Sequence, residues 1–538
     1  MFQNLWVAGE SRSWTLHRGS APDAAYVSHM AVAPSDRVSP QGLDIAGRLR
    51  DIVALDPSAP ALQFEGSWRP WSFFTSGMSA LDAALAPFGW GSGSMIGVVI
   101  RNRPEIARAV IGVLGTERCL VTLSSVVPPA TLAEELVRLA LPVVVAADQD
   151  WTPQLREAVA AAGSLGLRLV DDEQPAEVIV AAGERRGDAP TTRPGVAVQM
   201  LTSGTTGTPK RVDLHYDALG YELVSTSKYS ATADLSVPSL ASGVAIIWNP
   251  MVHTGGLRGL ITNMVAGRRV SLLERFSVAS WAALVAEHRP RAISLVPTAI
   301  RMVLDANLPR EALDGVVALF AGTAPLAPEL KDEWEQHFGI PALVIYGATE
   351  FGGVAGWTIG DWRKFGTGKR GSVGRANAGV EIRVVDQQSG APLANGETGL
   401  LETRSVQFGQ DGWIRTTDLA HMDDDGFLWI AGRVDDVLIR GGFKVATNAV
   451  AATLCRHPAV ADACVIAVPD ERLGQVPVAG VELRDGATLT SDELAAWAHT
   501  QLTAYQVPVK FLIVDQLPRT PSMKISQPGV RALLDAAG

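Results

Sequence analysis

The chain has 538 residues, of which 47% are hydrophobic and 19% charged. This length and balance are typical of a globular protein with at least two domains, and they exclude wholesale disorder, collagen and a coiled coil. The formal net charge is −10, from 46 Lys+Arg and 56 Asp+Glu. The electrostatic attraction that drives nucleic-acid binding is therefore missing at the level of the whole chain, and we expect no nucleic-acid partner.

The cysteines and the N-terminus bear on the compartment. Cys119, Cys455 and Cys464 are too few and too scattered for a disulfide framework or a paired metal site. The first residues, MFQNLWVAGESRSW, carry charge where a signal peptide is apolar, and apolar runs such as 139–147 are shorter than a membrane span. We expect a soluble, cytoplasmic protein with no membrane span.

Short β-branched runs alternate with helical patterns through most of the chain. The first predicted elements are a strand at 95–100, helices at 104–115 and 129–140, and a strand at 142–147. The same rhythm continues through 243–247, 278–287, 292–296, 317–321 and 342–345. This alternation predicts an α/β body with parallel sheets covered by helices.

The pattern changes near residue 371, where short strands separated by turn residues predict a β-rich subdomain. After residue 432 a hairpin-like segment precedes helices at 448–456 and 491–502 and strands at 463–468, 478–483 and 510–514. That length suffices for a small α+β core. We therefore predict an N-terminal domain at 1–434 and a C-terminal domain at 435–538.

The segment VQMLTSGTTGTPK, which ends at Lys210, is the most informative stretch. Its glycines let backbone N–H groups converge on an anion, its hydroxyls add donors, and the lysine adds a positive charge, so the loop is interpreted as a phosphate cradle. It is not a Walker A loop, because Pro209 stands where that motif needs glycine. The alternative is a solvated turn. FGWGSGSMIG lacks dinucleotide-loop spacing and is interpreted as a turn.

Four further motifs follow the cradle in order: YGATE at 346–350, Thr417-Asp418, GRVDD at 432–436, and PRTPSMK at 518–524. Together the five segments resemble those of the adenylate-forming superfamily of acyl-CoA synthetases, peptide-synthetase adenylation domains and luciferases, over roughly residues 45–532. The resemblance implies a two-step reaction. A carboxylate attacks the α-phosphate of ATP to give an acyl-adenylate and pyrophosphate, and a thiol or amine then displaces AMP.

The resemblance also implies roles for the matched residues. Those of the cradle would grip the β- and γ-phosphates: Thr202, Ser203, Gly204, Thr205, Thr206, Gly207 and Lys210. Adenine would be contacted by Tyr346 and Gly347 and by the backbone of Gly322, Thr323 and Ala324. Thr349 would contact the α-phosphate, and Glu350 would hold Mg²⁺. Asp418 would bind the ribose, and Arg433 both the ribose and the phosphate. One carboxylate plus phosphates is a usual way to hold Mg²⁺. Asp435 matches the hinge about which the C-terminal lid rotates.

Two residues are matched to the reaction centre. Lys524 corresponds to the catalytic lysine that would stabilise transition-state charge, although a lysine in a terminal loop is usually only solvated. His253 corresponds to a residue that gates or orients the acyl group, although a lone histidine beside apolar residues is more often part of a core. Trp248, Met251 and residues 348–353 would wall the acyl site, or be ordinary core.

Three positions depart from the family pattern. Residues 447–451 read TNAVA in place of Pro-x-Glu-[Ile/Val]-Glu, although Thr447 or Asn448 could cap the next helix. Met523 replaces a common glycine, which predicts a backbone there without positive φ. Thr417 also stands where glycine is common. The first departure adjoins Gly441 and Gly442, which in CoA-using relatives line the pantetheine tunnel.

The sequence thus predicts an AMP-forming ligase that uses ATP and Mg²⁺, a small-molecule carboxylic acid and CoA as the expected acceptor. The altered 447–451 segment and Met523 motivate an alternative, an amide synthetase with an amine or amino acid as acceptor. A second alternative is a nucleotide-binding regulator that has lost catalysis. The acidic run at 423–425 lacks the ligand spacing of an EF-hand and is interpreted as a plain turn.

Overall fold

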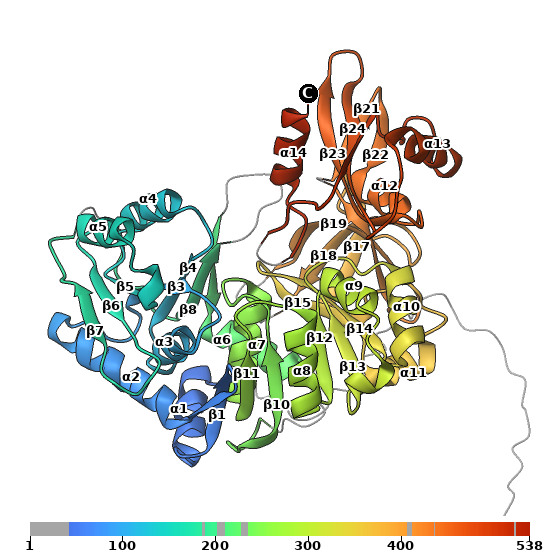
Figure 1. The fold of residues 1–538 in the computed structure, drawn as a ribbon. Helices are drawn as coiled ribbons and strands as arrows, with labels where there is room; N and C mark the ends of the chain where they lie inside the picture. Colours follow the sequence, from blue (N-terminus) through green and yellow to red (C-terminus); the bar gives the residue numbers. More distant parts are fainter. Residues whose placement is uncertain are drawn as a thin grey trace, which may run out of the picture. The chain divides into compact units, whose positions relative to one another are not determined.

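The computed structural model describes residues 42–185, 189–201, 210–226, 235–405, 412–434, 436–520 and 523–537, with Lys444 described by its backbone alone. All of them lie in one compact unit, residues 40–538 (Figure 1). Among these residues, no helix is long and apolar enough to cross a membrane.

The first sheet has the strand order β7-β6-β5-β3-β4-β8-β9 and is parallel except at its two edges. Its strands are β3 (Met95–Ile100), β4 (Cys119–Ser124), β5 (Val143–Ala146), β6 (Leu165–Arg168), β7 (Glu177–Val180), β8 (Val196–Leu201) and β9 (Arg211–His215). Helices α2 (Ser72–Leu85) and α3 (Pro104–Gly115) cover one face, and α4 (Pro129–Leu139) and α5 (Pro153–Ala161) the other (Figure 1). Strand β3 is buried throughout because helices cover both of its faces.

The second sheet has the order β10-β11-β1-β2. Its strands are β1 (Pro60–Phe64), β2 (Ser67–Pro70), β10 (Ala241–Ile247) and β11 (Arg268–Leu272). Its apolar residues share one core with those of helices α1 (Ile45–Leu55), α6 (Tyr216–Thr226) and α7 (Thr254–Val265).

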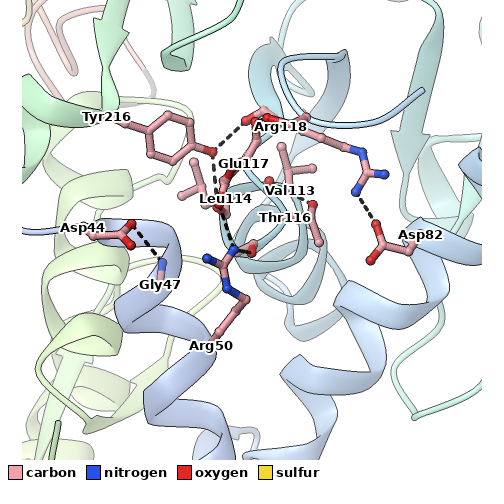
Figure 2. A network of polar contacts seen from close by, with 12 residues as sticks. Asp44, Gly47, Arg50, Asp82, Val113, Leu114, Thr116, Glu117, Arg118 and Tyr216 are labelled. Carbon is pink, nitrogen blue, oxygen red and sulfur yellow. Dashed lines mark hydrogen bonds and ion pairs between the residues drawn. The ribbon is translucent and has the colours of Figure 1, made fainter. Parts of the chain in front are cut away.

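Helix α6 is held at its first residue by a polar network (Figure 2). The hydroxyl of Tyr216 donates to the carbonyl oxygens of Arg118 at 2.8 Å and Leu114 at 3.2 Å. Burial raises the pKa of Tyr216, so the phenol remains a donor at neutral pH. Arg118 in turn pairs with Asp82 of α2 at 2.5 Å. The start of α6 is thereby fixed to the end of α3.

The third sheet has the order β12-β13-β14-β15-β16 and joins parallel strands to an antiparallel hairpin. Its strands are β12 (Ala292–Leu295), β13 (Ala318–Ala321), β14 (Ala342–Ala348), β15 (Gly352–Gly356) and β16 (Arg375–Ala376). The neighbouring helices are α8 (Val278–His288), α9 (Pro297–Asp305), α10 (Pro328–Phe338) and α11 (Ile359–Phe365). A core that includes Trp281 and Trp334 binds α8, α9 and α10 to this sheet.

Two more sheets complete the described chain. An antiparallel meander consists of β17 (Glu381–Val385), β18 (Gly399–Arg404), β19 (Ile414–Met422) and β20 (Leu428–Arg433). The last sheet consists of β21 (Val437–Arg440), β22 (Phe443–Ala446), β23 (Val460–Asp470), β24 (Gly474–Leu483) and β25 (Lys510–Val514). Helices α12 (Thr447–Leu454) and α13 (Ser491–Gln501) and, in a second small core, α14 (Gln527–Ala536) pack on it.

The α/β fold class with parallel sheets and a separate C-terminal part is confirmed, and the β-rich texture after residue 371 corresponds to the meander. The expected cap of the helix after residue 446 is wrong, because α12 has no side-chain cap bond. The Thr447 hydroxyl donates to the Asp436 carbonyl at 2.8 Å, and the Asn448 amide donates to the Asp436 carboxylate at 2.5 Å. Both side chains therefore tie α12 to the segment before β21.

Candidate active site

The hairpin of β14 and β15 carries the YGATE motif at its turn. Gly347 lies opposite Gly353 in the strand register, and a Cβ on Gly347 would lie 2.2 Å from the carbonyl oxygen of Gly352. Only glycine allows this approach, because real Cβ contacts are longer. The turn therefore presents Thr349 and the exposed Glu350 beyond the strand ends.

The phenol of Tyr346 donates a hydrogen bond to the carboxylate of Asp418 on β19. Burial and the charge of Asp418 raise the pKa of Tyr346, so the phenol remains a donor. Asp418 lies opposite Arg433 in the β19–β20 register, with 3.9 Å between Arg433 Nε and Asp418 Oδ1. Arg433 also donates to the hydroxyl of Thr417 at 2.6 Å. The departure to threonine at 417 thus gives Arg433 a hydrogen-bond acceptor.

Lys524 lies within electrostatic range of residues from two other segments. Burial and the positive charge of Arg433 lower its pKa, and the carboxylate of Glu350 opposes that shift. The structure therefore brings three of the predicted site residues together although they are far apart in the sequence. Two cations and one carboxylate in the same region would attract an anion.

The backbone before Lys524 contradicts the expectation from the sequence. Met523 has φ +63°, so the position does adopt the left-handed conformation that glycine favours. Its side chain packs against the apolar core that contains Trp248, and its carbonyl oxygen accepts from Thr298 Oγ1 at 3.2 Å. Arg519 donates to the same carbonyl at 3.4 Å and pairs with Asp462 at 3.0 Å. Tertiary contacts hold the strained residue in place.

Sequence reasoning missed Thr298 and undervalued Arg519. Arg519 lies inside the PRTPSMK motif, so the motif itself indicated that this arginine is close to Lys524. Thr298 follows Pro297 at the start of α9 and carries no motif signal. Its contact joins residues more than 200 positions apart.

His253 immediately precedes α7, where it makes no side-chain cap bond. Its Nε2 is buried and has no hydrogen-bond partner among the described residues. Burial, and secondarily the charge of Lys524, lower the pKa of His253 to about 4. The imidazole is therefore neutral at physiological pH. The next residue, Thr254, lies 2.6 Å from Thr349, hydroxyl to hydroxyl, a contact that the sequence did not suggest.

The remaining predicted residues are distributed as follows. Gly322, Thr323 and Ala324 follow β13, and Thr323 has φ +69° with its methyl group facing Gly255 of α7. Gly441 and Gly442 form the turn between β21 and β22 with φ +55° and +89°. Trp248 and Met251 are buried in the core. Lys210 is exposed just before β9, whereas residues 202–207 of the cradle and Asp435 lie outside the described residues.

The donor set at the turn fits Mg²⁺. Among the described residues, no group of three or more His, Cys, Asp or Glu side chains could form a metal cage by itself. Glu350 supplies one exposed carboxylate beside the hydroxyl of Thr349. Mg²⁺ usually takes one or two carboxylates and completes its shell with water and substrate phosphates, so this sparse set suits it.

Comparisons with known proteins assign the family. The family model described as AMP-binding enzyme matches residues 49–409. The family model described as AMP-binding enzyme C-terminal domain matches residues 449–524. The chain belongs to the AMP-binding enzyme family. The resemblance to the adenylate-forming superfamily is thereby confirmed, and this AMP-binding enzyme is an AMP-forming ligase.

Two relatives with curated names are CoA ligases. The sulfoacetate–CoA ligase of Cupriavidus necator is 30% identical over 516 residues, which cover 91% of this chain and 98% of the relative. The 2-succinylbenzoate–CoA ligase of Bacillus velezensis is 29% identical over 88% of this chain and 94% of the relative.

Solved structures share the fold of this AMP-binding enzyme. ATP-bound MatB from Rhodopseudomonas palustris aligns with a TM-score of 0.76 and 24% identity over 92% of this chain and 99% of that chain. The amide bond synthetase McbA from Marinactinospora thermotolerans aligns with a TM-score of 0.73 and 22% identity over 91% of this chain and 99% of that chain.

Proposed function

We propose that this ligase activates a small carboxylic acid with ATP and transfers the acyl group to CoA. The observation that carries the proposal is the cluster of Tyr346, Asp418 and Arg433. Lys524 lies within electrostatic range of Arg433 and of Glu350. The names of the two CoA ligases support the choice of acceptor, because both are similar to this chain over more than four fifths of its length.

In the first step a carboxylate oxygen forms a bond to the α-phosphorus of ATP, and the bond to the β-phosphate oxygen breaks to release pyrophosphate. The ammonium group of Lys524 would stabilise the negative charge that develops on the α-phosphate oxygens, with Arg433 as a second cation. Mg²⁺, held at Glu350, would neutralise phosphate charge. Asp418, oriented by Tyr346, would accept hydrogen bonds from the ribose hydroxyls.

In the second step the sulfur of CoA bonds to the acyl carbon, AMP leaves, and the thiol proton passes to solvent. Neutral His253 lies near Lys524 and would orient the acyl group without adding charge. Rotation at Asp435 would exchange the Lys524 loop for the Gly441–Gly442 turn, which we propose as part of the acceptor tunnel.

The test is AMP formation by the purified protein with ATP, Mg²⁺ and a panel of acids, run with CoA, with an amine mixture and with neither. AMP that accumulates only with CoA supports the proposal, and Lys524→Ala is the control. Amine-dependent turnover without CoA-dependent turnover would instead make the protein an amide synthetase.

One observation favours that second candidate. Thr447 and Asn448, which stand where the family pattern has proline and acidic residues, both bond to Asp436, just before the strand that leads to the Gly441–Gly442 turn. The regulator alternative is disfavoured, because the chain belongs to an enzyme family and retains Lys524 and Glu350.

A further inference from the structure

A charged pair lies at the junction of α6, α7 and β15. The guanidinium of Arg258 on α7 forms an ion pair with the carboxylate of Glu222 on α6. Glu222 Oε1 also accepts a hydrogen bond from the backbone N–H of Gly353 at 3.0 Å. The Arg258 and Glu222 side chains are 21% and 10% exposed. Such a pair is costly to desolvate, so its presence in the interior calls for a reason.

The pair lies along the proposed wall of the acyl site. Thr254 at the start of α7 contacts Thr349 in the turn before β15. Arg258 is four residues after Thr254, and Gly353, which bonds to Glu222, is four residues after Thr349. Four helical residues advance about 6 Å along the axis. Since residues 348–353 are the predicted wall, the pair lies about one turn of helix away from the Thr349 end, where the reacting carboxylate would be bound.

Arg258 retains an unused donor. Its Nε is buried and has no hydrogen-bond partner among the described residues. Burial lowers the pKa of Arg258 to about 10, so the side chain is still charged at neutral pH. Guanidinium carries five N–H donors, and a carboxylate that also serves Gly353 cannot occupy all of them. The Nε atoms of Arg168, Arg193 and Arg211 are likewise buried without a partner in the described part of the chain. Arg258 differs because its partner Glu222 also bonds to Gly353 of the predicted acyl wall, where a ligand would supply the acceptor.

We propose that Arg258 determines specificity by recognising an oxygen acceptor at the far end of a short acid substrate. A second carboxylate, a sulfonate or a ketone oxygen would supply that acceptor. A hydrocarbon tail in the same place would desolvate the pair and return no hydrogen bond. The inference rests on the proposed ligase function. Tyr216 anchors the first residue of α6 (Figure 2), the helix that also carries Glu222.

The test compares acids of similar size: succinate and sulfoacetate with an anionic acceptor, 4-oxopentanoate with a neutral one, and butyrate and pentanoate with none. AMP release with CoA gives kcat/KM for each acid. The wild-type protein is expected to favour acceptor-bearing acids by about 10- to 100-fold, the effect of a hydrogen bond to a charged group. The neutral and anionic arms then show which acceptor is preferred.

Two variants isolate the role of Arg258. Arg258→Met removes the donors at similar length, and Arg258→Met with Glu222→Gln also avoids an unpaired buried carboxylate. Both should lose the preference while retaining turnover of butyrate. The matched control is Arg101→Met with Asp150→Asn, which should keep the wild-type preference. This pair lies just after strands β3 and β5, and its side chains are 24% and 7% exposed. Circular dichroism verifies folding.

The outcomes separate the two proposals. No AMP with any acid and any acceptor would overturn the ligase function and this inference with it. Turnover of butyrate at the rate of succinate by the wild-type protein would overturn the inference alone. So would an unchanged preference in the folded double variant.

Discussion

Met523 is held in an unfavourable backbone conformation by side-chain packing, and the two effects can be separated. A left-handed conformation costs a non-glycine residue about 1–2 kcal/mol. Partial burial of its side chain against the Trp248 core returns about 1–2 kcal/mol. Met523→Ala keeps the strain and loses the packing, whereas Met523→Gly loses the packing but removes the strain.

The two substitutions should therefore differ. We expect Met523→Ala to slow adenylation about tenfold, since about 1.4 kcal/mol of packing that holds Lys524 in place is lost. Glycine avoids the cost of the left-handed conformation, but it loses about 0.5–1 kcal/mol more backbone entropy on folding. The net advantage of glycine over alanine is then about 0.5–1 kcal/mol, or roughly two- to fivefold in rate.

The assay measures the two half-reactions separately. Acid-dependent exchange of pyrophosphate into ATP reports adenylation, and CoA-dependent release of AMP from a supplied acyl-adenylate reports thioester formation. Only the rate of adenylation should fall. The bond between Thr298 and the Met523 carbonyl positions the adjacent Lys524, which acts in that half-reaction. An alanine variant as fast as the glycine variant, or an equal loss in both half-reactions, would refute the reasoning.

Three further predictions concern charge. Lys524→Gln should reduce AMP formation by about 10²- to 10³-fold with little change in CoA-dependent consumption of supplied adenylate, measured by single-turnover kinetics. Glu350→Gln should raise the Mg²⁺ concentration needed for half-maximal rate, and an unchanged titration would count against its metal role. The pKa of His253 falls to about 4, below the ordinary 6.5 of an unfolded histidine. The neutral imidazole therefore contributes stability that is fully present above about pH 6.5 and is lost as the pH falls toward 4. His253→Asn should accordingly lose less Tm than the wild type between pH 7 and pH 5 by scanning calorimetry, and parallel losses would contradict the assignment.

Local sequence pattern predicted what depends on local physics. The buried strand at 95–100 and the helix at 104–115 follow from an apolar run and a proline at a helix start. The YGATE motif could be placed just after a strand because the predicted strand at 342–345 directly precedes it. Helix ends were less accurate. Helix α12 spans Thr447–Leu454 instead of the predicted 448–456, and the expected capping residue Thr447 donates to the Asp436 carbonyl instead.

Contacts between distant segments could not be predicted. Thr298 and Met523 meet only in the folded chain, and the left-handed φ of Met523 runs against its local preference because packing outweighs strain. Glu222 and Arg258 are 36 positions apart on helices whose own periodicity gives no reason for a buried charge. Such contacts depend on how two distant elements pack against each other, and the local sequence of either element does not specify that packing.

Three residues that we assign to the site share one physical property. Lys524 lies within electrostatic range of Arg433. Among the described residues, neither the buried Nε2 of His253 nor the buried Nε of Arg258 has a hydrogen-bond partner. Each arrangement costs free energy in the free protein. A phosphate would offset the first, an acyl or phosphate oxygen the second, and a remote acceptor on the acid the third. Under the proposed function these three groups would each meet a different part of an acyl-adenylate, so that binding energy is concentrated on the reacting complex.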